Sequence, residues 1–142
     1  MQMSWAWNAA LAALFAGATA VIAKMGLGGI NADLGTLVRT AFVLVFLIAI
    51  YVTLHGAPSF GQLSSRAMAF LALSALSTAL SWLFYYRAIQ SGRIAAVAAI
   101  DKGSIIVTAV LAAVLLGEAL TLRVVGGAVL LSAGLWLMTT RS

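Results

Sequence analysis

The sequence predicts an all-α membrane protein, a bundle of five transmembrane helices, and three observations support this fold class. Of its 142 residues, 64% are hydrophobic and only 8% are charged, whereas a soluble domain has about a quarter of its residues charged. Five apolar stretches are each long enough for a membrane span, which needs roughly 20 residues. The connections between them are short, so we expect a single domain over residues 1–142.

We expect the five spans at about residues 4–23, 34–54, 66–89, 94–116 and 122–139. The first has no basic segment before it and is longer than the apolar region of a secretory signal, about 7–15 residues, so we interpret it as a retained span. Asp33 and Thr121 lie where helix N-caps belong, just before the second and fifth spans.

The composition excludes several classes of function. The chain has no cysteine, so it has neither a disulfide framework nor a thiolate metal site. Its single histidine, His55, cannot build a zinc site, and no nucleophile–base or nucleotide-binding motif appears. The net charge of +5 is spread along the chain. We therefore expect that the protein is not an enzyme and that it has no cofactor, no metal and no nucleic-acid partner. We expect it to lie in a lipid bilayer.

Basic residues in the connections predict the orientation of the chain, because short connections make neighbouring spans alternate in direction. Side A, the face of the N-terminus, carries Arg66 and Arg123. Side B carries Lys24, Arg87, Arg93 and Arg141. The positive-inside rule then places side B, with the C-terminus, in the cytoplasm and the N-terminus outside. The bias is weak, which leaves insertion in both orientations open.

Two opposite charges lie inside predicted spans at similar depth. Arg39 follows Asp33 by six residues, a depth of about 9 Å from side B, and Asp101 follows Ile94 by seven, about 10 Å. We predict that Asp101 faces Arg39, because a buried charge costs about 2.5–3.5 kcal/mol on insertion scales and a partner offsets this. Lys102 is expected to be a poor partner for Asp101, since adjacent helix residues point in different directions.

Hydroxyl side chains continue from these charges along one face of two spans. The stripes are Asp101, Ser104 and Thr108 on the fourth span, and Ser77, Ser81 and Tyr85 on the third. We expect them to line a polar cavity, with Asn8 of the first span near side A. The structural alternative is that the ion pair and its serines only lock the helices together.

Two aromatic residues and one carboxylate are left with two interpretations each. Trp82 and Tyr86 either line the mouth of the cavity or belong to the aromatic belt at the membrane interface. Asp101 is the first candidate for a group that binds and releases a proton and so couples proton movement to the passage of a ligand through the cavity. Glu118, at the side A end of the fourth span, is either a second coupling group or a surface carboxylate near Arg123, and the surface interpretation is favoured because exposed charge pairs are common.

Four segments carry a resemblance to a known family: "ADLGTLVRT", "LSWLFYYRAIQSG", "VAAIDKGSIIVTAVLAAVLLGE" and "LTLRVVGGAVLLSAG". They resemble the EamA-domain proteins of the drug/metabolite transporter superfamily, especially the short bacterial and archaeal members with five spans. The family pattern has proline two residues before the aspartate, where this sequence has Ala99. We therefore expect a smaller bend in the fourth span.

The resemblance implies a bundle equivalent to one half of a ten-span inverted-repeat transporter. It implies a secondary transporter in a bacterial or archaeal inner membrane, expected to export a small polar or amphipathic metabolite by alternating access. The active form would be a homodimer, parallel or antiparallel. Arg39 and Lys102 against Asp101 leave one positive charge, which is compatible with an anionic or zwitterionic ligand.

Two alternative functions remain. A small-multidrug-type cation exporter has similar size and dual topology, but such proteins use four spans and an acidic residue in the first, and the first span here has none. A non-transporting accessory or scaffold subunit of a membrane complex would use the ion pair only to hold its helices. Access of water to Ser77, Ser104 and Thr108 distinguishes the scaffold from a transporter.

Overall fold

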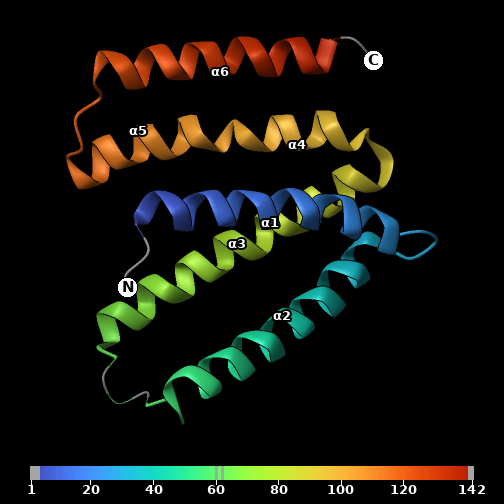
Figure 1. Ribbon diagram of the computed structural model, residues 1–142, viewed down its shortest axis with the longest axis vertical. Helices are drawn as coiled ribbons and strands as arrows, with labels where there is room; N and C mark the ends of the chain where they lie inside the picture. The colour runs from blue at the N-terminus through green and yellow to red at the C-terminus, as the bar shows by residue number, and fades with distance from the viewer. Residues whose placement is uncertain (1–3, 60, 62, 141–142) are drawn as a thin grey trace. The chain divides into compact units, whose positions relative to one another are not determined.

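The described elements of the structure are all helical, which confirms the all-α fold class. The computed structural model describes residues 4–59, 61 and 63–140, and no strand occurs within them. Arg141, used to predict the orientation, lies outside the described residues. The helices are α1 (Trp5–Gly26), α2 (Ala32–His55), α3 (Ser65–Ser91), α4 (Ile94–Lys102), α5 (Ser104–Leu116) and α6 (Leu122–Thr140) (Figure 1).

Within the described residues, five helical segments are long and apolar enough to cross a membrane. Four are the helices α1, α2, α3 and α6, and the fifth, Ile94–Leu116, consists of α4 and α5. Every predicted boundary lies within three residues of the observed one. Many large apolar side chains are exposed, up to 91% for Leu122, as expected where helices face lipid.

Helix α2 begins at a side-chain cap. Asn31 has extended backbone angles, and its Oδ1 accepts hydrogen bonds from the N–H groups of Asp33 (2.8 Å) and Leu34 (3.3 Å). The prediction that Asp33 is the N-cap is therefore wrong by two residues, because an asparagine amide performs that role equally well. Asp33 instead lies in the first turn, where the helix dipole favours a carboxylate. The start of α6 is as predicted, since Thr121 Oγ1 accepts from Val124 N–H at 3.3 Å.

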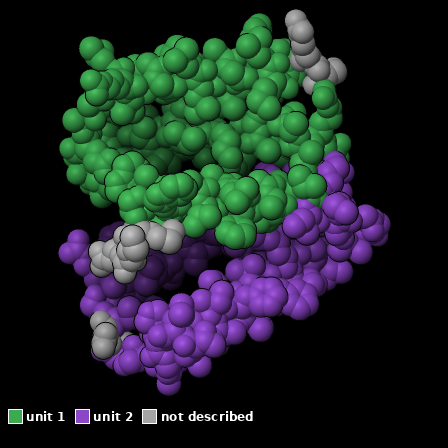
Figure 2. Space-filling model, viewed as in Figure 1, with its two compact units in different colours: residues 1–21, 91–142 green, residues 22–90 purple. Residues whose placement is uncertain are grey.

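The chain divides into two compact units (Figure 2). Unit 1 comprises residues 1–21 and 91–142, and so contains most of α1 together with α4, α5 and α6. Unit 2 comprises residues 22–90, which form the end of α1, the loop after it, α2 and α3.

In unit 1, α4 and α5 lie along α6 (Figure 1), and Gly103 interrupts the span between them. The Gly103 N–H donates to the Ile100 carbonyl at 2.9 Å, and the Gly103 carbonyl accepts from Ile106 N–H at 3.0 Å. These are the tighter bonds of a 3₁₀ turn. A Cβ on residue 103 would lie 2.9 Å from the Ile100 carbonyl oxygen, so the interruption requires glycine. It occurs although Ala99 stands at the family's proline position.

In unit 2 the buried residues of α2 and α3 lie at one end, where α2 begins and α3 finishes. They are Ala32, Thr36, Tyr86 and Ile89, the last of which is 0% exposed. Leu27, in the loop after α1, is also buried. A Cβ on Gly35 would lie 2.5 Å from the Leu27 side chain, so this glycine lets the loop pack closely on α2. The rest of α2 and α3 has no buried residue in its described part.

Candidate functional site

The predicted site residues are distributed over both units. Unit 2 holds Arg39 on α2 and Ser77, Ser81, Trp82, Tyr85 and Tyr86 on α3. Unit 1 holds Asn8 on α1, Asp101 and Lys102 at the end of α4, Ser104 and Thr108 on α5, and Glu118 after α5. Arg39 and Asp101 thus belong to different units, and their pairing stays a prediction.

The Arg39 guanidinium lies against two aromatic rings of α3. Its central carbon is 4.3 Å from the centroid of the Trp82 ring and 5.8 Å from that of the Tyr86 ring. Trp82 and Tyr86 are four residues apart, so they share one face of α3. A cation over an aromatic face gains about 2 kcal/mol when shielded from water. Both rings therefore belong to the immediate surroundings of Arg39.

Two polar atoms at this contact are buried without a hydrogen-bond partner among the described residues. They are Nη1 of Arg39 and the hydroxyl oxygen of Tyr86, a residue that is only 4% exposed. Buried polar groups are hydrogen-bonded in the great majority of cases, and each unsatisfied group costs about 1–3 kcal/mol, more when charged. The aromatic rings offset part of this cost for Arg39 but accept no hydrogen bond from Nη1. The contact therefore retains two groups able to donate to a further molecule.

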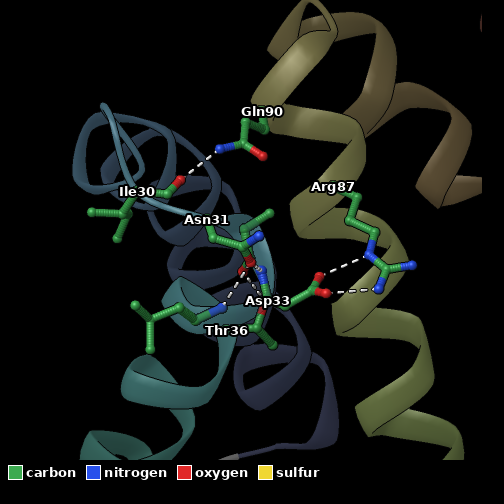
Figure 3. A network of polar contacts seen from close by, with 8 residues as sticks. Ile30, Asn31, Asp33, Thr36, Arg87 and Gln90 are labelled. Carbon is green, nitrogen blue, oxygen red and sulfur yellow. Dashed lines mark hydrogen bonds and ion pairs between the residues drawn. The ribbon is translucent and has the colours of Figure 1, made fainter.

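The Arg87 guanidinium, in contrast, is paired with a carboxylate. Arg87 of α3 donates two parallel hydrogen bonds to Asp33, from Nε to Oδ1 and from Nη2 to Oδ2, both 2.7 Å long (Figure 3). The side chains are 51% and 44% exposed, so water shares in solvating the pair. The sequence prediction missed this pair, since Asp33 was assigned to a cap and Arg87 to topology. The sequence did contain a signal for this pair, because it places both residues at the side B ends of consecutive antiparallel helices.

Two more contacts hold the same end of unit 2. Gln90 Nε2 donates to the Ile30 carbonyl at 2.6 Å (Figure 3). Lys24 Nζ donates to the Ile89 carbonyl at 2.7 Å, near the end of α3, where the helix dipole favours a cation. We call these two bonds and the Asp33–Arg87 pair the side B contacts. They join α1, the loop, α2 and α3.

On α4, Asp101 binds its own neighbour. Lys102 Nζ lies 3.1 Å from Asp101 Oδ2, so the expectation that these adjacent side chains point apart and do not meet is wrong. The lysine stem is long and flexible enough to turn back towards an adjacent side chain. The side chains remain 53% exposed for Lys102 and 36% for Asp101, and a pair so exposed contributes little. Asp101 therefore remains available to other partners.

Comparison with known proteins identifies the family. Residues 3–140 match the EamA-like transporter family. The chain belongs to this family. A curated relative from Sinorhizobium sp, named "Uncharacterized transporter in cobO 3'region", is 41% identical over 138 residues, which cover 97% of this chain and 98% of the relative. No solved structure shows a significant match.

The resemblance expected from the four sequence segments is thereby confirmed, and the chain is a multi-pass membrane transporter. The match extends over nearly all of both units of this EamA-like transporter, so the arginine contact of unit 2 and the charged end of α4 both fall within the family domain.

The hydroxyl stripes of the EamA-like transporter are exposed on the single chain. Ser77, Ser81, Ser104 and Thr108 are all exposed. Ser77 Oγ donates to the Leu73 carbonyl one turn earlier, at 3.1 Å. The α3 residues beside Arg39 are Trp82 and Tyr86, each one position after the predicted stripe residues Ser81 and Tyr85. The stripe and the arginine contact are therefore neighbouring faces of α3.

Asn8 and Glu118 are also exposed in the EamA-like transporter. In the part of the chain that the structure describes, no three histidine, cysteine or acidic side chains form a group that could hold a metal ion. The candidate site thus consists of charged, hydroxyl and aromatic side chains.

An apolar groove of about 350 Å³ lies between α5 and α6 in unit 1. Its lining residues are Ile106, Ala109, Val110, Leu120, Val124, Val125, Ala128, Val129 and Ser132. The one hydroxyl in this lining, on Ser132, donates to the Ala128 carbonyl at 2.8 Å. The groove offers little for a polar metabolite to bind and is distinct from the polar cavity that the sequence predicts.

Proposed function

We propose that this chain is a secondary transporter that exports a small polar or amphipathic metabolite. The observation that carries the proposal is Arg39, a cation inside the α2 span whose buried Nη1 has no partner among the described residues. Ionisable residues within spans mark substrate and ion pathways. Family membership supports transport. Because the sequence contains no nucleotide-binding motif, we propose that an ion or substrate gradient drives it.

Arg39 supports a functional role better than a structural one. An arginine that only joins helices is stabilised by a carboxylate, as Arg87 is by Asp33. Burying a charge without such a partner is strongly unfavourable. A half-buried arginine with one buried N–H that has no acceptor among the described residues is advantageous where a ligand supplies the acceptor during part of the transport cycle.

The proposed pathway includes the remaining predicted residues. Asp101 is proposed as the proton-coupling group, with Glu118 as the second candidate. Because the sequence places Asp101 and Arg39 at similar depth, Asp101 is proposed to face Arg39 while no ligand is bound and to give way when the ligand binds. The residues proposed to line or border the pathway are Asn8, Ser77, Ser81, Trp82, Tyr85, Tyr86, Lys102, Ser104 and Thr108.

The proposed working unit is a homodimer of the whole chain, in which residues 1–142 act as one domain. An odd number of spans with a weak basic bias supports insertion in both orientations and an antiparallel pair. Inverted-repeat transporters place their site at the interface of the repeats. We propose an inner-membrane location with the C-terminus mainly cytoplasmic. A C-terminal reporter found on both sides of the membrane supports the antiparallel dimer, and one found only in the cytoplasm contradicts it.

Cysteine labelling tests whether a water-lined pathway exists. The chain has no cysteine, so single-cysteine variants report without background. Cysteines at Ser77, Ser104 and Thr108 should react with a water-soluble maleimide in intact membranes. A cysteine at Leu76, on another face of α3, is the control and should react much more slowly. Equal protection of all four positions would contradict the pathway and favour a scaffold role.

Transport itself is tested with purified protein in proteoliposomes. A panel of labelled amino acids, carboxylic acids, organophosphates and organic cations should include a compound that accumulates under an imposed gradient. Empty liposomes and the Arg39→Gln variant are the controls. Accumulation that is equal with and without Arg39 would remove Arg39 from the proposed mechanism.

A further inference from the structure

The charge balance of unit 2 leaves Arg39 uncompensated. Between residues 22 and 90 the chain has one acidic residue, Asp33, and it is bound on both oxygens by Arg87. Lys24 donates to a backbone carbonyl, and Arg66, near the start of α3, lies 5.9 Å from the Phe70 ring. Arg39 is therefore the cation of this unit that combines a buried, unpartnered N–H with an aromatic environment.

Nη1 of Arg39 has no hydrogen-bond partner among the described residues, although the guanidinium contacts the Trp82 ring. Trp82 lies 4.3 Å from the guanidinium carbon and takes up a cation–π contact. Such a contact uses the face of the planar group, whereas its N–H bonds point outward in the plane. Because Nη1 is buried, a ligand reaches it only when the surrounding side chains move apart, and the face contact with Trp82 can be kept when they do.

We infer that Arg39 and Tyr86 form a binding site for an anionic group, a carboxylate or a phosphate, carried by the substrate. The inference rests on the proposed function and specifies the substrate class of that same site. A guanidinium is a donor only, a phenol hydroxyl can donate, and an ionised carboxylate or phosphate is an acceptor only, so the two unsatisfied groups match an anion. Bonds of guanidinium to carboxylate or phosphate are also among the strongest in proteins.

An organic cation does not fit this contact. It would place a second positive charge next to an Arg39 that has no carboxylate beside it within unit 2. Like charges at such short range repel strongly where water is excluded. The same donors could, however, bind the phosphate of an anionic lipid, so the source of the anion has to be distinguished by experiment.

Trp82 provides a direct probe, because it touches Arg39. The chain has four tryptophans, so changing Trp5, Trp7 and Trp136 to phenylalanine leaves Trp82 as the sole reporter. This variant is placed in phosphatidylcholine nanodiscs and titrated with benzoate, benzyl alcohol and benzylammonium, which share a ring but differ in charge. We expect benzoate to change the Trp82 emission in a saturable way. The concentration that gives half of the change should be at least tenfold lower for benzoate than for benzyl alcohol or benzylammonium.

Variants connect the response to the named groups. Arg39→Gln should abolish it, Arg39→Lys should retain it at lower affinity because the charge remains, and Tyr86→Phe should weaken it several-fold. Arg66→Gln is the matched control and should leave it unchanged. A benzoate response that persists in Arg39→Gln, or a stronger response to benzylammonium, would overturn the inference. If Arg39→Gln does not fold, equal benzoate affinity in Arg39→Lys, Tyr86→Phe and the parent would overturn it.

A second titration, in nanodiscs of a different lipid, determines whether the anion comes from the substrate or from a lipid. In nanodiscs of phosphatidylglycerol, a substrate site should keep the benzoate response. Loss of that response together with an Arg39-dependent emission change on adding phosphatidylglycerol would overturn the substrate assignment and identify a lipid phosphate as the ligand. Saturable transport of a cationic or neutral compound, with no benzoate response, would overturn this inference while leaving the transport function intact.

Discussion

Arg87 and Arg39 lie on neighbouring helices of unit 2 and differ in what surrounds them. Arg87 is half exposed and binds both oxygens of Asp33 at 2.7 Å. Arg39 has Trp82 at 4.3 Å and a buried Nη1 with no partner among the described residues. The first arrangement is complete without any ligand. The second leaves one buried N–H without an acceptor in the described structure. This difference separates a helix-joining arginine from one that we propose for substrate binding.

The two charged pairs show the same contrast among carboxylates. Asp33 is held bidentately, whereas the ion pair of Asp101 among the described residues is one contact of 3.1 Å with the adjacent Lys102. A carboxylate in one weak, exposed contact changes partners readily. Asp101 is also two residues from Gly103, where the helix is interrupted. The carboxylate of Asp33 is thus bound on both oxygens, whereas the carboxylate of Asp101 has one partly exposed contact.

The largest effect is expected on transport when the Arg39 charge is removed, and removal of the Arg87 charge provides the comparison. Arg39→Gln should lower transport of the best substrate by about 10- to 100-fold, the equivalent of one hydrogen bond to a charged group. Arg87→Gln should lower it much less, because Arg87 contacts Asp33 and not the ligand. Initial rates in proteoliposomes at matched protein content measure both. Equal losses of transport in the two variants would contradict the assignment of ligand binding to Arg39 and of helix joining to Arg87.

The next largest effect is expected on proton-driven transport, where Asp101 and Asp33 should differ. Asp101→Asn should reduce transport driven by a proton gradient by about tenfold or more, since an amide cannot take up and release the proton. Asp33→Asn should retain most of it. Exchange of unlabelled for labelled substrate without a gradient should survive in Asp101→Asn. Gradient-driven transport at the parental rate in Asp101→Asn would exclude Asp101 as the coupling group.

A smaller effect is expected from the Tyr86 hydroxyl. Tyr86→Phe removes one neutral hydrogen bond to the ligand and should lower transport by about 2- to 10-fold. Because this buried hydroxyl has no protein partner in the described structure, thermal stability should stay the same or rise. Tyr51→Phe, on the exposed side of α2, is the control and should change neither quantity. A marked loss of stability in Tyr86→Phe would show that the hydroxyl is satisfied within the protein.

The smallest effect concerns the Asp33–Arg87 pair. Because both side chains are about half exposed, Asp33→Asn and Arg87→Gln should each lower the thermal midpoint by a few degrees at most. The double variant should be no less stable than either single one, since both remove the same contact. Thermal unfolding in one detergent measures all three. Strictly additive losses would show that the two residues stabilise the protein independently.

The fold was predictable because hydropathy alone limits the chain to helices in a bilayer. Each span is a continuous apolar stretch, so its ends could be placed to within three residues. The interruption at Gly103 was not predicted, because the interior of that span is apolar on both sides and a glycine inside a helix has several uses. The close approach of its Cβ position to the Ile100 carbonyl becomes visible only in three dimensions.

The residues discussed at the candidate site were mostly named from the sequence, but the contacts that the structure shows among them were not predicted. Arg39, Trp82 and Tyr86 were each named, yet their mutual contact was missed because rotation of α2 and α3 about their axes cannot be read from depth. The Asp33–Arg87 pair was missed because each residue already had a sufficient local explanation. The Asp101–Lys102 contact was rejected on helix geometry, which describes Cβ directions but underestimates the reach of a flexible lysine.

The most direct test of the central claim measures stability and transport of Arg39→Met together. If Arg39, with its buried and unpartnered Nη1, is kept for a ligand, replacing it by an apolar side chain of similar length should leave the thermal midpoint unchanged or raise it, while transport falls to the level of empty liposomes. If Arg39 instead joins the helices, the midpoint should fall clearly. A destabilised variant, or a stable one that transports at the parental rate, would contradict the account.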